Sequence, residues 1–428
     1  MGYKLSMYNI KAGKSENEGN YYFNTLSGAI VSLDKETEEY INKTPLDNYI
    51  EEQPWFEYLS NKGFIVPENL NEYERIQSYK DELLHSPHSQ RASFVIALTT
   101  ACNYQCTYCY EEGCEKIQMS SVTAQNVARF IEEKCSANLL LKEITVTWFG
   151  GEPLLNMEAI QTIGDELLKF CDSKGYGFST NIITNGYLLS EKTLDDLLIY
   201  NLKSIQITFD GTKEFYDRYK KPVDAKAYDI VFDNVIRASH RCHVVIRLNC
   251  LKDNYSSVKD LCREFVGSDA NIENMSFSLA RVIDANDPNC ISNEEYSDYR
   301  RDFIEFLADL KLEFMVKKFL PSPHAIPCGL MQKTNYVIDS SGLLYKCEHF
   351  VGKPSFSIGN VVEGELYPSI KRKFIETPMY EKCSTCPIYP VCRGGCSQKR
   401  FAGESSVSCD NKMSEIMFAL EMVIKSHG

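Results

Sequence analysis

Three cysteines close to residue 100 stand at a spacing that suits an iron–sulfur cluster. The segment CNYQCTYC places Cys102, Cys106 and Cys109 in a C-x3-C-x2-C array. Three thiolates can hold a cube of four irons and four sulfides and leave one iron free for a further ligand. Zinc sites normally close with four protein ligands, and ferredoxin-type runs carry a fourth cysteine. The spacing therefore favours a cluster with an open iron.

Seven further cysteines follow residue 327. They are Cys328, Cys347, Cys383, Cys386, Cys392, Cys396 and Cys409. The remaining seven of the 17 cysteines are scattered singly, mostly in apolar surroundings, and we expect them to be small core residues: Cys114, Cys135, Cys171, Cys242, Cys250, Cys262 and Cys290. An odd number of cysteines in a chain with no recognisable export signal argues against a disulfide framework and for metal ligation.

Short β-rich runs alternate with helical stretches between residues 94 and 310. The expected strands are SFVIAL, EITVTWF, FSTNIIT, SIQITF, HVVIRLN and NMSFSL, and helical periodicity fills intervals such as VTAQNVARFIEEKC. This alternation predicts an α/β fold in which six β/α units build a partial parallel barrel. In such barrels the functional groups lie on loops after the carboxyl ends of the strands, and the CNYQCTYC loop directly follows the first strand.

The CNYQCTYC loop resembles the signature of the radical S-adenosylmethionine (SAM) superfamily, whose open iron chelates the amino and carboxylate groups of SAM. Gly150, Gly151 and Glu152 after the second strand are similar to the GGE motif of that family, in which backbone groups and the acid hold the methionine amino group. Thr208 and Asp210 after the fourth strand resemble its S-x-D-G motif, whose hydroxyl contacts SAM. The resemblance implies that these residues and Tyr108 of the loop bind the cofactor.

A cation should pair with the SAM carboxylate. In related members the segment after S-x-D-G continues to an arginine, and the aligned residue here is Lys220. Lysine supplies the charge without a bidentate fork. Arg218 is an alternative, and Arg247 points with Asn249 toward the same rim if strand alternation holds. An ordinary ion pair is an equally good interpretation of Arg247.

The C-terminal cysteines resemble those of the SPASM domain, which holds auxiliary clusters in enzymes that mature ribosomal peptides and sulfatases. The resemblance covers the order of the seven cysteines and the segments CRGGC and GLLYKCEHF. It implies that Cys383, Cys386, Cys392 and Cys409 hold a second auxiliary cluster. It also implies that Cys328, Cys347 and Cys396 hold a first one, which makes three four-iron clusters with that of the CNYQCTYC loop.

The first auxiliary cluster is one thiolate short. Sulfatase-maturing members carry a further cysteine six residues before the first ligand, and Ser322 stands there in this chain. Either Ser322, His324 or another nearby group completes the site, or the position accepts a thiolate from the substrate. A distant cysteine such as Cys290 could also complete it.

The resemblances, together with the points at which the alternation of β-rich and helical stretches stops, divide the chain into four predicted parts. Residues 1–75 suggest a small antiparallel sheet with helices and resemble winged-helix-like modules that recognise leader peptides by adding a strand to a sheet edge. A structural extension is the alternative. Residues 76–92 form a linker or docking helix, 93–312 the barrel and 313–428 the SPASM domain.

Together these parts predict an enzyme that splits SAM and uses the resulting 5′-deoxyadenosyl radical on a ribosomal precursor peptide, forming a cysteine thioether crosslink. The electron would come from a donor such as flavodoxin or ferredoxin. Formylglycine formation on a sulfatase is the main alternative, because Glu348 stands after Cys347 where sulfatase maturases carry an aspartate proposed to remove a proton. Glu348 could instead only hydrogen-bond near the cluster.

Other activities remain open at this point. Carbon–carbon crosslinking or epimerisation of a peptide fits the family, and a non-catalytic zinc or electron-transfer protein is a hypothesis of another class. A formal net charge of -13 argues against nucleic acid or an anionic membrane as the main partner. Because no apolar run reaches signal-peptide or membrane-spanning length, we expect a cytoplasmic protein.

Overall fold

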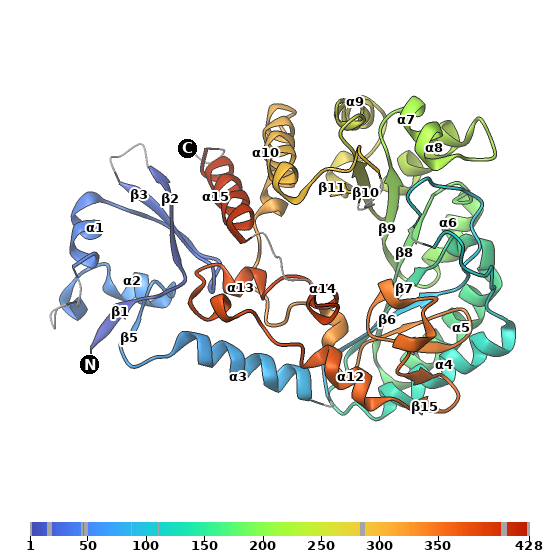
Figure 1. Ribbon diagram of the computed structural model, residues 1–428, viewed down its shortest axis with the longest axis horizontal. Helices are drawn as coiled ribbons and strands as arrows, with labels where there is room; N and C mark the ends of the chain where they lie inside the picture. The colour runs from blue at the N-terminus through green and yellow to red at the C-terminus, as the bar shows by residue number, and fades with distance from the viewer. Residues whose placement is uncertain are drawn as a thin grey trace. The chain divides into compact units, whose positions relative to one another are not determined.

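The chain divides into two compact units. The computed structural model describes residues 2–14, 19–43, 46, 50–86, 88–109, 111–282, 287–403 and 409–425 (Figure 1). The terminal unit comprises Met1–His85, Ser297–Cys328 and Glu376–Gly428, and the sheet unit comprises Ser86–Tyr296 and Gly329–Ile375. The C-terminal cysteine-rich region therefore contributes to both units.

Parallel strands in chain order build the centre of the sheet unit. They are β6 (Arg91–Ala97), β7 (Glu143–Phe149), β8 (Gly177–Thr184), β9 (Leu202–Phe209), β10 (His243–Cys250) and β11 (Met275–Arg281). The helices between them are α4 (Ser121–Ser136), α5 (Met157–Lys174), α6 (Glu191–Leu198), α7 (Lys213–Lys220), α8 (Ala227–Ser239) and α9 (Tyr255–Val266). Figure 1 shows α4, α5 and α6 along one side of this sheet. The predicted strands are all present, and the predicted parallel sheet wound with helices is confirmed.

Local sequence explains these elements. Ile144, Val146 and Trp148 of β7 alternate with less buried residues and fill the core. Helix α4 begins where the Ser120 side chain accepts a hydrogen bond from the backbone N–H of Thr123, and α6 begins with the same arrangement at Ser190. These caps fix where each helix starts after its preceding loop.

The sheet continues beyond β6 with residues from far along the chain. Strand β12 (Tyr336–Ile338) pairs in parallel with β6, so that Tyr336 lies opposite Phe94. Strands β13 (Leu343–Tyr345), β14 (Gly359–Asn360) and β15 (Gly364–Glu365) follow in antiparallel order, and α12 (Pro368–Ile375) comes after them. Part of the region 313–428 thus extends the same sheet.

The terminal unit begins with the expected antiparallel sheet and helices. Strand β1 (Tyr3–Leu5) pairs with β5 (Ile65–Pro67), and β2 (Asn9–Lys14), β3 (Asn20–Asn24) and β4 (Ile30–Leu33) form a second sheet. The helices are α1 (Lys35–Ile41), α2 (Phe56–Asn61), α3 (Glu72–His85), α10 (Asn293–Asp309, which starts in the sheet unit), α11 (Glu313–Val316), α13 (Tyr389–Cys392), α14 (Ser397–Phe401) and α15 (Cys409–Lys425). Most of α3 lies in residues 76–92, the stretch expected to be a linker or docking helix, but the helix already begins at Glu72.

Short 3-10 turns complete the chain. They are η1 (Ile50–Glu52), η2 (Pro153–Asn156), η3 (Ile272–Asn274), η4 (Lys317–Phe319), η5 (Gly329–Met331), η6 (Glu348–Phe350), η7 (Pro354–Phe356) and η8 (Glu381–Thr385). Within the described ranges, no helix is long and apolar enough to cross a bilayer.

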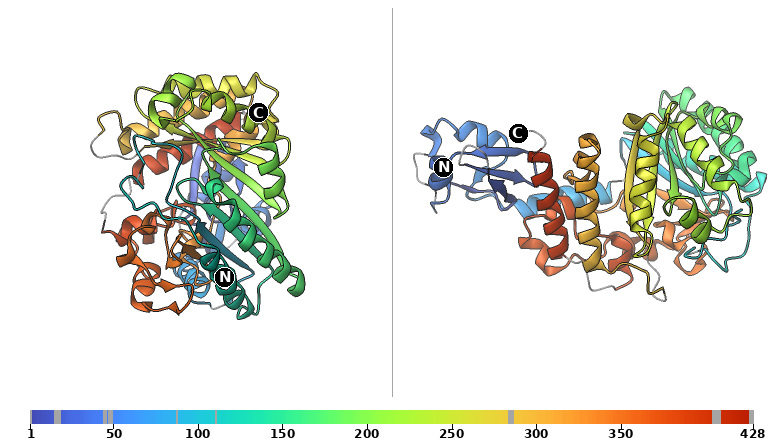
Figure 2. Two further views of the ribbon diagram at one scale, coloured as in Figure 1. Left: turned by 90° about the vertical axis from the view of Figure 1, so that its right-hand side faces the viewer. Right: turned by 90° about the horizontal axis from the view of Figure 1, so that it is seen from above.

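Both faces of the β2–β3–β4 sheet are covered within the terminal unit. Val31 and Leu33 of β4 pack on one face against apolar residues of α1, α2 and β5. Ile10 of β2 and Phe23 of β3 pack on the other face, against Leu420 of α15 and residues of α13. Figure 2 shows α15 beside these strands. The first and last segments of the chain therefore share one core.

Candidate active site

A cavity of about 440 Å³ lies at the carboxyl ends of strands β6 to β9 in the sheet unit. Cys102, Cys106 and Cys109 line it from the loop after β6. The other predicted residues that line it are Gly150, Gly151, Thr208 and Lys220. Groups from loops that are distant in the sequence meet because parallel strands present their carboxyl ends at one edge.

Gly150 and Gly151 bring the end of β7 against the backbone that precedes Cys102. Gly150 has a φ of +131°, and a Cβ on it would lie 2.3 Å from the carbonyl oxygen of Thr99. A Cβ on Gly151 would lie 2.4 Å from the carbonyl oxygen of Ala101. The Gly151 N–H donates to the Thr99 carbonyl at 2.8 Å. Only glycine allows this approach, which fixes the start of the cysteine loop.

Glu152 is fully buried, and its carboxylate accepts three hydrogen bonds from the protein. Its Oε1 accepts hydrogen bonds from the backbone N–H of Leu154 at 3.0 Å and from the Thr184 hydroxyl at 2.7 Å. Its Oε2 accepts from the N–H of Asn185 at 2.8 Å. Burial raises the pKa of the Glu152 carboxyl, and these hydrogen bonds oppose the rise. The carboxylate ties the end of β7 to the end of β8, so any contact with a ligand amino group would be additional to this role.

Tyr108, Asp210 and Lys220 form a buried polar group beside the cysteines. The Tyr108 hydroxyl donates to Asp210 Oδ1 at 2.5 Å, and Lys220 Nζ lies 3.7 Å from Asp210 Oδ2. Asp210 is 0% exposed and Lys220 is 4% exposed. Burial raises the pKa of Asp210, while the Lys220 charge and the hydrogen bond from Tyr108 lower it. The positive charge of Lys220 is therefore balanced by Asp210, and the Lys220 side chain lines the cavity.

The other two candidate cations are engaged elsewhere. Arg218 Nη1 pairs with Asp253 Oδ2 at 3.2 Å in a partly exposed ion pair. Arg247 lies opposite Thr208 in the β9–β10 register and donates from Nε to Asn249 Oδ1 at 3.1 Å. Within the described part of the chain, neither arginine is among the residues that line the 440 Å³ cavity.

Backbone contacts fix the cysteine loop to the end of α7. The N–H of Thr107 donates to the carbonyl of Tyr219 at 2.9 Å, and that of Gln105 donates to the carbonyl of Lys220 at 3.3 Å. Burial raises the pKa of the Cys102 thiol to about 11 and also raises that of Cys106, which the Lys220 charge partly offsets. Buried thiols ionise when iron or another cation compensates the thiolates. Three converging thiols in a cavity therefore fit a cluster with an open iron.

Sequence reasoning missed two polar residues of this cavity. Asn185 follows β8 and donates from Nδ2 to Asn103 Oδ1 at 2.7 Å and to Cys102 Sγ at 3.8 Å. Its place after a barrel strand was the available signal. Glu111 is buried, its Oε1 has no hydrogen-bond partner among the described residues, and burial raises its pKa to about 7. Nothing in the sequence distinguishes Glu111 from its neighbour Glu112.

A second cavity, of about 50 Å³, lies in the terminal unit and is lined by Cys383, Cys386, Cys392 and Cys409. These are the four residues assigned to the second auxiliary cluster by resemblance. Burial raises the pKa of the Cys383 and Cys386 thiols. Within the described ranges, no group of three or more His, Cys, Asp or Glu side chains is placed to bind one metal ion. A four-iron cluster does not need such a group, because each of its irons takes one thiolate. The convergence of four cysteines on one small cavity is the donor set that a closed cluster requires.

The residues assigned to the first auxiliary cluster belong to different units. Cys328 and Cys396 lie in the terminal unit, and Cys347 lies in the sheet unit. Glu348, the candidate base, begins η6 in the sheet unit and is half-buried. It is not among the residues that line the 440 Å³ cavity within the described part of the chain.

Comparison with protein families gives one match. The model of the Radical SAM superfamily covers residues 96–265, which include the cysteine loop and strands β7 to β10. The prediction of an α/β radical SAM domain is therefore confirmed, and the ends of β6 to β9 described above lie within the matched residues.

Curated and solved proteins extend the likeness beyond that domain. A cysteine-type anaerobic sulfatase-maturating enzyme of Clostridium novyi is 25% identical over an alignment of 332 residues, which covers 70% of this chain and 86% of that protein. The structure described as native anSMEcpe with bound AdoMet and Kp18Cys peptide is similar with a TM-score of 0.63 at 17% identity, over 78% of this chain and 99% of that chain. Streptococcus suis SuiB bound to S-adenosylmethionine has a TM-score of 0.52 at 17% identity, over 92% and 95%. SuiB has also been solved bound to the precursor peptide SuiA.

Proposed function

We propose that this chain, whose residues 96–265 are a radical SAM domain, is a maturase that modifies a ribosomally made precursor peptide. The observation that carries the proposal is the cavity in which Cys102, Cys106 and Cys109 meet Thr208 and Lys220. Bound there, a four-iron cluster with an open iron would supply the electron that splits SAM into methionine and a 5′-deoxyadenosyl radical. A peptide substrate is supported by the likeness to anSMEcpe and SuiB, both solved with bound peptides.

The residues of the cavity have distinct roles in this proposal. Lys220 supplies the positive charge for the SAM carboxylate, and Asp210 and Tyr108 hold Lys220 in place. The backbone of Gly150 and Gly151 and the Thr208 hydroxyl, which line the same cavity, would contact the rest of the cofactor. Glu152 keeps the ends of β7 and β8 in register with the cysteine loop. Most of the catalytic benefit comes from positioning, because the cofactors carry the difficult chemistry.

The specific reaction we propose is thioether formation at a precursor cysteine. The resemblance assigns Cys328, Cys347 and Cys396 to the first auxiliary cluster. If a protein group completes that cluster, the candidates are Ser322, His324, another nearby group and a distant cysteine such as Cys290. His324 is exposed, and its Nδ1 lies 3.1 Å from the Ser322 carbonyl oxygen. An open position would accept a precursor thiolate and hold its sulfur near the carbon radical. The 5′-deoxyadenosyl radical would take the hydrogen atom of that carbon and become 5′-deoxyadenosine, and the thiol would lose its proton on binding iron. Formation of the carbon–sulfur bond would leave one electron, which the auxiliary cluster would accept.

Formylglycine formation is the second candidate function. The 25% identity to a sulfatase-maturating enzyme over 86% of its length favours it, as does the place of Glu348 after Cys347. The two reactions leave different products. A thioether retains the cysteine sulfur and loses two hydrogens, whereas formylglycine replaces the sulfur by an aldehyde oxygen, which mass spectrometry of the peptide distinguishes.

Residues 1–75 would bind the leader of the precursor. Within the described ranges, strand β5 pairs only with β1, so its other edge has no strand partner. Ile65 and Val66 of β5 line a cavity of about 390 Å³ with Phe56 and Ser60 of α2. An extended peptide could add a strand there and place alternate side chains in the cavity.

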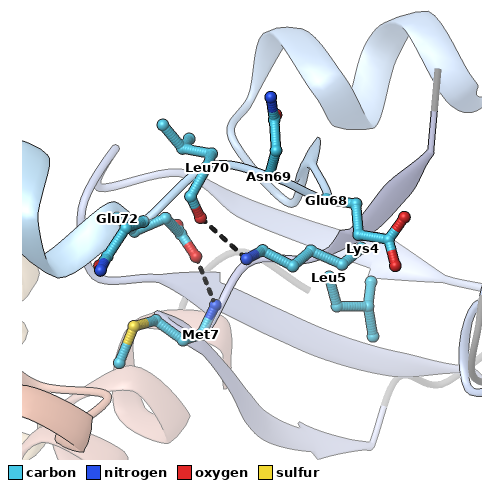
Figure 3. A pocket seen from close by; sticks show the side chains of 8 residues that line it. Lys4, Leu5, Met7, Glu68, Asn69, Leu70 and Glu72 are labelled. Atoms are coloured by element: carbon cyan, nitrogen blue, oxygen red, sulfur yellow. Dashed lines mark hydrogen bonds between the residues drawn. The ribbon is translucent and has the colours of Figure 1, made fainter.

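Hydrogen bonds around a neighbouring cavity of about 330 Å³ hold strand β1 and the turn after it in place (Figure 3). Lys4 Nζ donates to the Leu70 carbonyl at 2.8 Å, and the Met7 N–H donates to Glu72 Oε2 at 2.9 Å. The first contact joins β1 to the segment between β5 and α3, and the second joins the turn after β1 to the first residue of α3. The substitution Ser60→Trp should fill the 390 Å³ cavity and weaken leader binding, whereas Glu57→Trp on the exposed side of the same helix should not.

The central test uses anaerobically reconstituted protein and measures iron, sulfide and 5′-deoxyadenosine. Three clusters predict about twelve irons and twelve sulfides per chain. Replacing Cys102, Cys106 and Cys109 together by Ala should remove about a third of the iron and abolish 5′-deoxyadenosine. The matched control is Cys114→Ala in the same loop, which should change neither. Persistent 5′-deoxyadenosine in the triple variant would exclude this cavity as the site of SAM cleavage.

A further inference from the structure

Two arginines are buried close to the cavity of the four cysteines in the terminal unit. Arg393 is 3% exposed and Arg400 is 7% exposed. Arg393 directly follows Cys392, and Arg400 approaches Gly394, which lines the cavity itself. Burying a guanidinium costs free energy unless an anion or a full set of hydrogen bonds compensates it. The hydrogen-bond and ion-pair partners of the two side chains therefore indicate whether an anion should be bound in the cavity of the four cysteines.

Arg400 has only neutral partners in the described part of the chain. Its Nη1 donates to the carbonyls of Gly394 at 2.6 Å and Gly395 at 2.9 Å, and its Nη2 lies 3.4 Å from the Ser397 hydroxyl. Its Nε is buried without a hydrogen-bond partner. The charge of Arg400 is thus left uncompensated by any described carboxylate.

Arg393 is in the same situation. Its Nε donates to the His324 carbonyl, and its guanidinium lies 5.2 Å from the centre of the Tyr389 ring. Its Nη1 is buried without a hydrogen-bond partner among the described residues. The backbone at Arg393 is left-handed, with a φ of +49°. A non-glycine residue in this conformation is uncommon and needs surroundings that hold it there.

The one strongly anionic group expected in this region is a cluster with four thiolate ligands. Four thiolates outweigh the charge of the four-iron, four-sulfide core, so the whole is an anion, and nearby charges and hydrogen bonds set its reduction potential. We propose that Arg393 and Arg400 provide the positive charge that balances a cluster held by Cys383, Cys386, Cys392 and Cys409, and thereby raise its reduction potential. The inference rests on the assignment of that cluster under the proposed function.

A second contribution of Arg400 is geometric. Gly394 and Gly395 have φ values of +72° and +73°, so with Arg393 the CRGGC segment carries three successive left-handed residues. The hydrogen bonds from Arg400 to the two glycine carbonyls hold this turn, which lies between Cys392 and Cys396. Arg400 is therefore a positioning residue as well as a counter-charge.

The experiment compares variants on a background in which Cys102, Cys106 and Cys109 are Ala, so that the catalytic cluster is absent. Iron content and the midpoint potential of each remaining cluster are measured by an EPR-monitored redox titration of the full chain. Arg400→Gln keeps a side-chain N–H for the glycine carbonyls but removes the charge, and Arg400→Lys keeps the charge. Arg75→Gln, an exposed arginine of the same unit, is the matched control.

The expected result is a more negative potential for one cluster in Arg400→Gln, because adding an electron to an anion becomes harder without the cation. Arg400→Lys and Arg75→Gln should stay close to the parent. If Arg400→Gln loses that cluster while Arg400→Lys keeps it, the charge role is also supported. An unchanged potential in Arg400→Gln, or loss of the cluster from both Arg400 variants, overturns it. If replacing Cys383 and Cys386 by Ala removes no iron, the cluster assignment itself fails.

Discussion

Gln77 of helix α3 donates a hydrogen bond of 2.6 Å from its Nε2 to the hydroxyl of Tyr389, the first residue of α13. The Thr25 hydroxyl similarly donates to the carbonyl of Pro387 at 2.6 Å. Around these bonds, Tyr8 and Ile76 pack in one apolar cluster with Cys383. The N-terminal segment therefore supports the segment that carries the proposed second auxiliary cluster.

This shared core predicts that residues 1–75 cannot be removed without cost to the cysteine cavity. Deleting them would return buried side chains such as Ile416 and Leu420 to water, at about 1.5–3 kcal/mol for each. We expect the truncated chain to lose about a third of its iron and to unfold at a lower temperature. Full iron content in the truncated protein would contradict this expectation and would support the separate module that the sequence pattern predicted.

The sequence predicted the parallel strands well because their signal is local. EITVTWF and HVVIRLN carry apolar alternation and β-branched residues, and the Gly150–Gly151 pair marks a close backbone approach. The pairing of Tyr336–Ile338 with β6 escaped prediction, because a three-residue strand has no periodicity and its partner lies more than 200 residues away. The packing of Cys383 on Tyr8 escaped it for the same reason. Among the site residues, Lys220 was found by alignment to a motif, whereas Glu111 carries no pattern.

Glu152→Gln should impair both the fold and the chemistry. The carboxylate accepts from two backbone N–H groups and a hydroxyl, and an amide would turn a donor toward at least one of them. Leaving a buried polar group unsatisfied costs about 1–3 kcal/mol. We expect a lower melting temperature and a loss of 5′-deoxyadenosine formation of at least tenfold. Glu143→Gln, at the other end of β7, should leave both measurements close to the wild type.

Lys220→Ala should weaken SAM binding, because it removes the proposed partner of the SAM carboxylate. A charge-assisted hydrogen bond contributes about 1.5–3 kcal/mol, which corresponds to roughly tenfold to hundredfold in Kd. Equilibrium dialysis with SAM measures the change. Arg218→Ala removes a neighbouring cation that pairs with Asp253 outside the cavity, and its Kd should be near that of the wild type. A larger effect from Arg218 than from Lys220 would transfer the role to Arg218.

Glu38 should make the terminal unit sensitive to acid. Hydrogen bonds from Lys11, Tyr22 and Asn20 lower the pKa of the Glu38 carboxyl to about 2 from its ordinary value of 4.5. A carboxyl with a depressed folded-state pKa stabilises the fold above pH 4.5 and loses that contribution as the pH falls toward 2. Thermal unfolding followed by circular dichroism should show this loss. Glu38→Gln should flatten the dependence, and Glu36→Gln on the same helix should retain it.

The proposed open position of the first auxiliary cluster predicts a spectroscopic response to substrate. Thiolate binds iron strongly, so a precursor cysteine should replace water or a weak ligand at the set Cys328, Cys347 and Cys396. Spectra of the auxiliary clusters should change when the cysteine-containing precursor is added to protein lacking the catalytic cluster. The same peptide with its cysteines replaced by serine is the control and should cause no change, although its leader still binds. The variants Ser322→Ala and His324→Ala test whether either residue is the fourth ligand of the cluster. A spectral response that appears only after one of these substitutions would identify the replaced residue as that ligand. It would then favour formylglycine or carbon–carbon chemistry.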